Sequence, residues 1–181
     1  MSKLAALDQL LEQYQQLSYH TDPILEKRLH EAQGWLKVRI QKTHHDLFNQ
    51  KENQLMAKYF INRLYGGPEF DDLALQIERL LKYAHKAEKI IPENAIKTGL
   101  KSVGLAVLAM QLDEQVAAQL LQDYPADQAI DDEMMRQTLL KLDQHDARLE
   151  QLGLLDDLGG ALDKYMRSFI MHTAFKMCKG T

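Results

Sequence analysis

The fold of this chain depends most on one stretch near its middle, Ser102–Leu112, which reads SVGLAVLAMQL. It is the longest stretch without a charged residue, and residues 103–110 have no polar side chain. A helix that is apolar on every side lies in the interior of a protein. A membrane-spanning helix needs about 20 apolar residues. The stretch therefore predicts a buried core helix, and we expect no membrane partner.

Glycine and proline are scarce outside this core segment as well, with 9 and 4 copies among 181 residues. That scarcity disfavours an all-β sandwich, which needs frequent turn residues. No segment alternates like a half-buried strand, and each proline stands where a helical pattern begins or ends. We predict an all-α fold, a single-domain helical bundle of about seven to eight helices spanning residues 1–181.

The expected helices follow from the spacing of apolar residues and from capping residues. They cover about residues 2–17, 23–47, 50–65, 71–91 and 131–152, with a last helix over 156–176. Two more helices are expected between residues 92 and 122. The first begins at Pro92 and contains residues 103–110, and the second is short, is capped by Asp113 and ends at Gln122.

The charge and cysteine content restrict the partners and the compartment. Lys and Arg number 22 against 26 Asp and Glu, so the formal net charge is −4. Binding to nucleic acid needs clustered basic residues, and we therefore expect no nucleic-acid partner. A single cysteine, Cys178, excludes an intramolecular disulfide and is typical of a reducing compartment. The first eight residues lack the apolar core of a secretory signal, so we expect a cytoplasmic protein.

Sequence motifs of the common enzyme classes do not occur in the chain. It has no glycine-rich nucleotide-binding motif, no H-E-x-x-H, no C-x-x-C and no Glu-x-x-His pair of the kind that builds di-iron bundles. We therefore predict no cofactor, and the sequence favours a protein that is not an enzyme.

A metal or haem cofactor is nevertheless an alternative, because three residues share one helix flank. Glu26 and His30 are four residues apart, and His44 follows on the same flank. They could form one edge of a metal site if another helix supplied the remaining ligands. The simpler interpretation is a solvated flank on which Glu26 and His30 form an ordinary side-chain pair.

One segment, residues 60–70, reads FINRLYGGPEF. It resembles the F-x-x-x-L-Y-G-x-x-[DE]-F motif of an uncharacterised family of bacterial, mostly proteobacterial, proteins. The resemblance continues weakly in residues 91–92 and 159–165. It implies a soluble, all-helical bacterial protein without an established activity. Relatives usually have further helical residues after the last motif, so we expect a shorter or C-terminally truncated member.

Two interpretations of this motif remain open. In the first it is a corner between two helices, with Gly66 and Gly67 turning the chain and Phe70 packing back on the core. In the second it frames a binding site for a small-molecule ligand. The candidate ligand-binding residues are Tyr59, Phe60, Arg63, Tyr65, Glu69 and Phe70.

The sequence as a whole predicts a non-catalytic binding or assembly module. We expect self-association as a homodimer, because the apolar core helix and the methionine-rich last helix offer more apolar surface than a small bundle covers. One alternative is a helical metal- or haem-dependent oxygenase-like enzyme or cofactor binder. A second is a carrier of a small hydrophobic ligand, with its pocket beneath the aromatic residues of the motif.

Overall fold

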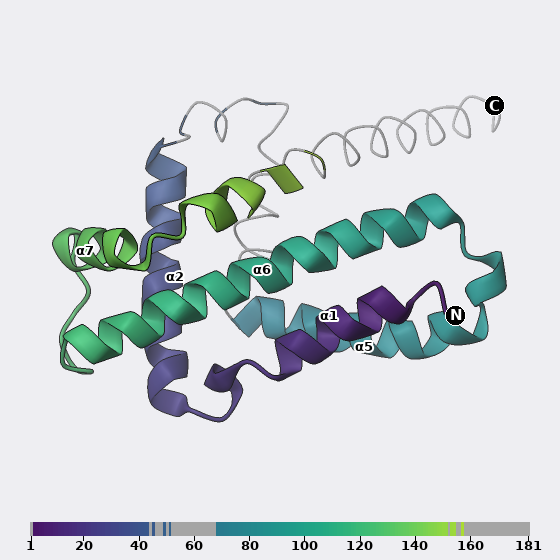
Figure 1. Cartoon of the computed structure of the whole chain (residues 1–181), viewed down its shortest axis with the longest axis horizontal. Coiled ribbons are helices and arrows are strands. Elements are labelled where there is room, and N and C mark those ends of the chain that lie inside the picture. Colours follow the sequence, from purple (N-terminus) through teal and green to yellow (C-terminus); the bar gives the residue numbers. More distant parts are fainter. Residues whose placement is uncertain are drawn as a thin grey trace, which may run out of the picture.

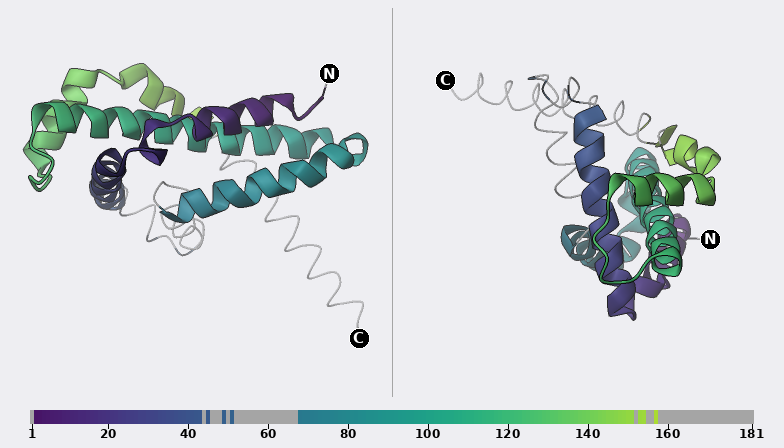
Figure 2. Two further views of the ribbon diagram at one scale, coloured as in Figure 1. Left: turned by 90° about the horizontal axis from the view of Figure 1, so that it is seen from below. Right: turned by 90° about the vertical axis from the view of Figure 1, so that its left-hand side faces the viewer.

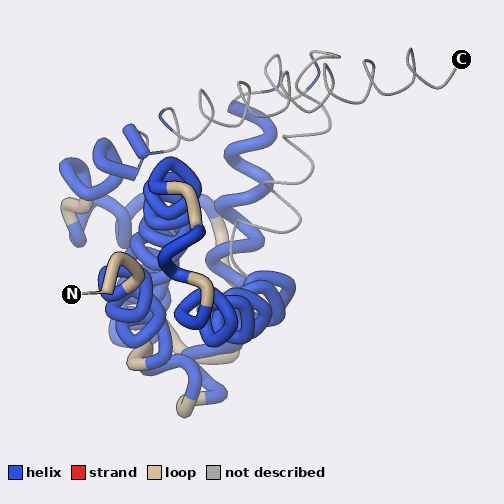
Figure 3. Tube along the Cα trace, turned by 90° about the vertical axis from the view of Figure 1, so that its right-hand side faces the viewer, coloured by secondary structure: helices blue, strands red, loops and turns tan. Residues whose placement is uncertain are grey.

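The computed structural model describes residues 2–43, 45, 49, 51, 68–151, 153, 154 and 157. All regular structure in these residues is helical, which confirms the predicted all-α class (Figure 3). The elements are α1 (Ala5–Gln15), the 3-10 turn η1 (Ser18–His20), α2 (Pro23–Thr43), α5 (Pro68–Lys86), the 3-10 turn η3 (Glu88–Ile90), α6 (Glu93–Asp123) and α7 (Asp132–Leu142). A further helix begins at residue 145.

Helix α6 is the centre of the arrangement, as the apolar stretch at residues 102–112 predicts. It runs the length of the described part, with α1 along its N-terminal half, α2 crossing it and α7 beside its C-terminal half (Figure 1). No residue from 102 to 113 is exposed. By length and composition α6 could also cross a membrane, a criterion that the core helices of soluble proteins also meet.

The buried apolar side chains form two clusters, one on each half of α6. The first joins α1, η1, α5 and the start of α2 to the N-terminal part of α6, with Leu7, Leu11, Leu29, Val107 and Met110 among its members. The second joins α2 and α7 to the C-terminal part of α6. Because α2 contributes to both clusters, it ties the two halves of the structure together.

The number of helices in the described residues differs from the prediction. The described residues form six α-helices, counting the one that begins at residue 145, where the sequence indicated seven to eight. Asp113 does not cap a new helix, because α6 continues through it without a break. Its side chain is only 1% exposed and accepts a hydrogen bond from Arg148, so the interior of the protein satisfies this carboxylate within one long helix.

The expected helix over residues 131–152 is divided in two. Of the two residues that could start this helix, Asp131 and Asp132, it is Asp131 that caps α7, by accepting a hydrogen bond from the backbone N–H of Met134 at 2.8 Å. The helix ends at Leu142, and Asp143 takes the left-handed conformation (φ 47°, ψ 51°) before the next helix begins. Aspartate tolerates that conformation better than most residues. The expected helices over 50–65 and 156–176 lie almost entirely outside the described residues.

Helix α5 begins beside α2 and runs away from it along α1 (Figure 2). Its buried side chains, Phe70, Ala74 and Leu81, belong to the first core cluster. A further polar contact with α1 lies near the end of α5, where His85 pairs with Asp8 at 2.9 Å. This packing brings the first turn of α5 next to the first turns of α2, where the candidate site lies.

Candidate functional site

Two tyrosines and one aspartate from three separate elements meet at the start of α5. Tyr14 lies in the last turn of α1, Tyr19 in η1 and Asp71 in the first turn of α5. Both hydroxyls donate hydrogen bonds to Oδ1 of Asp71, that of Tyr19 at 2.7 Å. The two hydroxyl oxygens lie 3.1 Å apart. One carboxylate oxygen therefore accepts two hydroxyl protons, which fixes the orientation of Asp71.

The backbone between the two tyrosines turns sharply, and packed rings hold them in place. Leu17 adopts an extended conformation (φ −61°, ψ 136°) that ends α1 and leads into η1. The ring centroids of His20 and Tyr19 lie 4.1 Å apart. The ring of Phe70 packs edge-on against that of Tyr14, with 5.5 Å between the centroids. The imidazole Nε2 of His20 lies 2.9 Å from the backbone oxygen of Tyr14. These contacts leave the hydroxyls little freedom to move away from Asp71.

The environment keeps both tyrosines in their protonated form. Burial and the hydrogen bond to Asp71 raise the pKa of Tyr14 above its ordinary value. Burial and the hydrogen bonds among the three groups raise the pKa of Tyr19 in the same way. At neutral pH both side chains therefore act as hydrogen-bond donors and not as phenolates.

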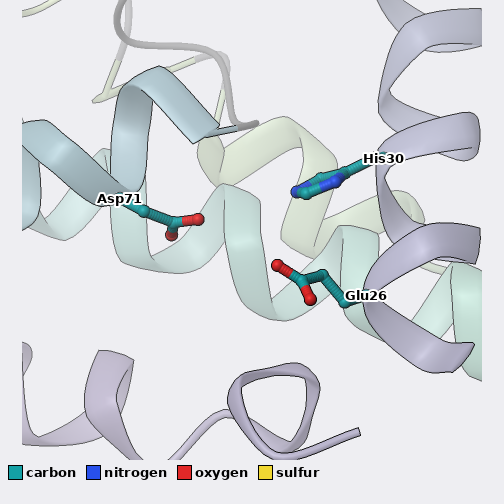
Figure 4. Close-up of side chains that lie close together, drawn as sticks. All are labelled: Glu26, His30 and Asp71. Atoms are coloured by element: carbon teal, nitrogen blue, oxygen red, sulfur yellow. The ribbon is translucent and has the colours of Figure 1, made fainter. Parts of the chain in front are cut away.

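Asp71 also faces two side chains of α2, Glu26 and His30. The helix places these two residues one turn apart, and all three side chains point into the space between α2 and α5 (Figure 4). One ligand atom from each residue lies within 4.8 Å of the other two. An imidazole and two carboxylates at this spacing are a set of side chains that could bind a metal ion.

Each of these three residues has at least one potential ligand atom without a partner among the described residues. His30 Nε2 is buried and has no hydrogen-bond partner there. Asp71 Oδ2 accepts no hydrogen bond from a described residue, because both tyrosines donate to Oδ1. Glu26 forms no ion pair with a described residue, whereas Glu31 one turn later pairs with Arg28 at 2.9 Å.

A shallow surface hollow lies beside Glu26 and His30. Its lining also includes Pro23, Lys27 and Glu31 from the same end of α2. Solvent or a small solute can therefore approach Glu26 and His30 from this side.

The sequence predicted part of this group. The i,i+4 spacing indicated, as an alternative to a solvated flank, that Glu26 and His30 could form one edge of a site, and the structure places Asp71 of α5 near enough to add a third candidate ligand. The sequence indicated Asp71 or Asp72 only as the residue that opens this helix, since an aspartate at a helix start is ordinarily a cap, whereas α5 already begins at Pro68. The third predicted member, His44, lies outside the described residues.

The residues predicted around the motif at 60–70 are only partly described. Phe70 is 3% exposed and packs on Tyr14 in the core, as the corner interpretation expects. Glu69 lies in the first turn of α5, and its side chain is outside the described part. Tyr59, Phe60, Arg63 and Tyr65 lie outside the described residues altogether.

A second polar group, which the sequence did not indicate, lies within the core. Asp113 accepts hydrogen bonds from Arg148 at 3.0 Å and from the amide of Gln33 at 3.5 Å. Burial raises the pKa of the Asp113 carboxyl, although Arg148 opposes the shift. This group links α2, α6 and the helix that begins at residue 145, and its place in the core indicates a structural role.

A protein-family model described as "Domain of unknown function (DUF8198)" matches residues 16–181. The chain belongs to this family. The matched region contains Tyr19, Glu26, His30 and Asp71. Comparison with curated proteins and with solved structures found no significant match. This membership confirms the predicted resemblance to an uncharacterised family. Two parts of that prediction stay predictions: that the motif at residues 60–70 is a feature of the family, and that the family is bacterial.

Proposed function

We propose that this protein binds a divalent transition-metal ion through Glu26, His30 and Asp71. One observation supports the proposal most: an imidazole and two carboxylates from two different helices have their ligand atoms within 4.8 Å of one another. The buried, unpartnered Nε2 of His30 adds to it. Buried polar atoms without a partner are rare in proteins, and a bound ion would give this nitrogen the partner it lacks.

The chemistry of the three side chains favours zinc, with manganese or ferrous iron next. Imidazole nitrogen suits zinc and iron, whereas sites for magnesium and calcium consist of oxygen ligands. Ligands about 2.1 Å from a tetrahedral zinc ion lie about 3.4 Å from one another. Side-chain rotations that bring the ligand atoms inward by roughly an ångström would reach that geometry from the present spacing.

Tyr14 and Tyr19 would support the metal site from behind Asp71. Their hydroxyls bind Oδ1 and leave Oδ2 for the ion. Such outer partners orient metal ligands, and their loss typically weakens metal binding 10- to 100-fold.

Among the functions considered from the sequence, this site favours the metal-dependent alternative. Three protein ligands leave a coordination position for water or a substrate, as in catalytic zinc sites, whereas structural zinc sites have four protein ligands. The adjacent hollow would give a small molecule access to that position.

Assembly as a homodimer is a second and separate proposal. It is supported by the apolar side chains that α5 exposes: Leu75 is 47%, Leu80 66% and Tyr83 70% exposed. Exposed apolar surface of this kind is typical of interaction sites. Sedimentation velocity at micromolar concentration tests it: a dimer supports the proposal, and a monomer that persists as concentration rises contradicts it.

Isothermal titration calorimetry with zinc tests the metal site. Zinc titrated into chelator-treated protein should bind at one ion per chain, and Glu26→Gln, His30→Gln and Asp71→Asn should each weaken binding at least tenfold. Asp72→Asn is the matched control, because this exposed neighbour lies outside the group. The proposal would be overturned if the wild type did not bind zinc, or if all three variants bound zinc as tightly as the wild type.

A further inference from the structure

Helix α5 is attached by its polar contacts to α1 and η1. Near its start Asp71 binds Tyr14 and Tyr19, and further along Glu78 accepts a hydrogen bond from Gln15 at 3.3 Å. At its end His85 pairs with Asp8. The contacts of Glu78 and His85 are exposed, and exposed polar pairs stabilise little.

Neither Glu26 nor His30 of α2 forms a hydrogen bond or ion pair with a described side chain of α5. The two helices nevertheless present unpaired ligand atoms to each other, Glu26 and His30 from α2 and Asp71 Oδ2 from α5. The facing carboxylates repel each other when no cation lies between them. A divalent cation between them would attract both carboxylates and so turn the net repulsion into attraction.

We infer that metal binding clamps the first turn of α5 to α2, so that occupancy of the site controls how firmly α5 is docked. The inference rests on the proposed function and adds to it a regulatory role: the ion would join Glu26 and His30 of α2 directly to Asp71 of α5. Helix α5 would open more readily without the ion than with it.

The clamp has a quantitative consequence for local opening of α5. An ion that binds only the docked arrangement suppresses every opening that separates α5 from α2 by the factor 1 + [L]/Kd, which is about 100-fold at a free ion concentration of 100 Kd. Openings elsewhere that leave the site intact are unaffected. Metal binding should therefore slow the exchange of backbone amides in α5 more than in α7, which lies at the other end of α6.

Hydrogen–deuterium exchange of the full chain, with and without zinc at 100 times the measured Kd, tests the clamp. We expect exchange over residues 72–80 to slow by up to about 100-fold, and by much less over residues 136–142. Glu26→Gln is the matched variant, because it removes a ligand on α2 and leaves the contacts of α5 with α1 unchanged. In that variant the effect of zinc on residues 72–80 should disappear.

Two outcomes would overturn the inference while leaving the proposed function intact. In the first, calorimetry shows zinc bound at this site, yet residues 72–80 slow no more than residues 136–142. In the second, zinc protects only the amides of α2, as expected of an ion held by Glu26 and His30 alone. Failure of calorimetry to detect binding would instead overturn the proposed function.

Discussion

Asp71 accepts hydrogen bonds from two tyrosines that precede it by 57 and 52 positions in the sequence. With the proposed metal bound, this residue would have two roles at once. Oδ1 attaches α5 to α1 and η1, and Oδ2 would bind the metal ion. A carboxylate can serve both because each oxygen accepts independently.

The Tyr19→Phe variant tests whether the hydroxyls support the site. Its ring would still fill a position that is 1% exposed, but the 2.7 Å hydrogen bond to Asp71 would be lost. We expect the free energy of unfolding to fall by about 1.5 kcal/mol and zinc binding to weaken about tenfold. Urea denaturation and calorimetry measure the two effects.

Tyr83→Phe is the matched control for this experiment, because Tyr83 is 70% exposed on α5. Measured at a concentration at which the protein is monomeric, it should change neither the free energy of unfolding nor zinc binding. If Tyr19→Phe behaves like this control, the hydroxyl of Tyr19 has no supporting role.

At the residue scale, the sequence indicated the two candidate ligands that lie on one helix, as an alternative to a solvated flank, and did not indicate the candidate on another helix. Glu26 and His30 share a flank because residues four apart on a helix always do. Asp71 lies on α5, and its approach to α2 depends on the packing of α5 against α1, which no local pattern encodes. The partnership of Tyr14 and Tyr19 with Asp71 depends on the same packing.

Among the elements, the loop between α6 and α7 depends on a buried arginine of α2. Arg28 is 1% exposed and donates hydrogen bonds to the backbone oxygens of Pro125 at 2.7 Å and Gln128 at 2.9 Å. Its guanidinium also pairs with Glu31 at 2.9 Å. This side chain fixes the loop, and therefore the position of α7, against α2.

The Arg28→Met variant should lower the free energy of unfolding by about 3 kcal/mol, because it leaves carbonyl groups of the loop without donors. Amide exchange over residues 126–130 should accelerate as the loop loosens. Lys27→Met is the control, since Lys27 has a 70% exposed side chain and should stay within about 0.5 kcal/mol of the wild type. Equal stability of the two variants would contradict this role of Arg28.

At the element scale, Pro92 marked a helix end correctly and Asp113 did not. Pro92 was correctly placed at the start of α6, whereas Asp113 was taken for a helix start and is buried in the helix interior. The difference is physical, because proline acts on its own backbone. An aspartate caps a helix only if no tertiary partner such as Arg148 satisfies it elsewhere.

For the whole molecule, Asp113 makes stability depend on pH. Burial raises the pKa of its carboxyl in the folded state above the unfolded value of about 4, so the folded state holds this proton more tightly. The contribution of Asp113 to stability is complete below about pH 4 and declines as pH rises towards the raised pKa.

Urea denaturation between pH 4 and pH 7 should detect this decline. Relative to Asp113→Asn, which cannot ionise at this position, the wild type should lose free energy of unfolding as pH rises. Asp127→Asn, which changes an exposed carboxylate of the loop, should follow the wild type at every pH. If the free energy of unfolding of the wild type instead rose with pH relative to that of Asp113→Asn, the raised pKa of Asp113 would be contradicted.

For the whole molecule, the all-α fold class was predictable because it depends on composition and on the periodicity of apolar residues along the chain. The apolar stretch at residues 102–112 marked the central helix, and few glycines and prolines excluded frequent turns. The packing of α1, α2, α5 and α7 around α6 was not predictable, since several helix faces of similar apolarity compete for the same partner.

The central claim is that Glu26, His30 and Asp71 together bind one metal ion, and anomalous diffraction from crystals of the zinc-loaded protein tests it most directly. Data recorded on both sides of the zinc absorption edge should show one anomalous peak about 2.0–2.2 Å from a ligand atom of each of the three residues. Zinc held by other side chains, or no peak between α2 and α5 in zinc-saturated crystals, would contradict the claim.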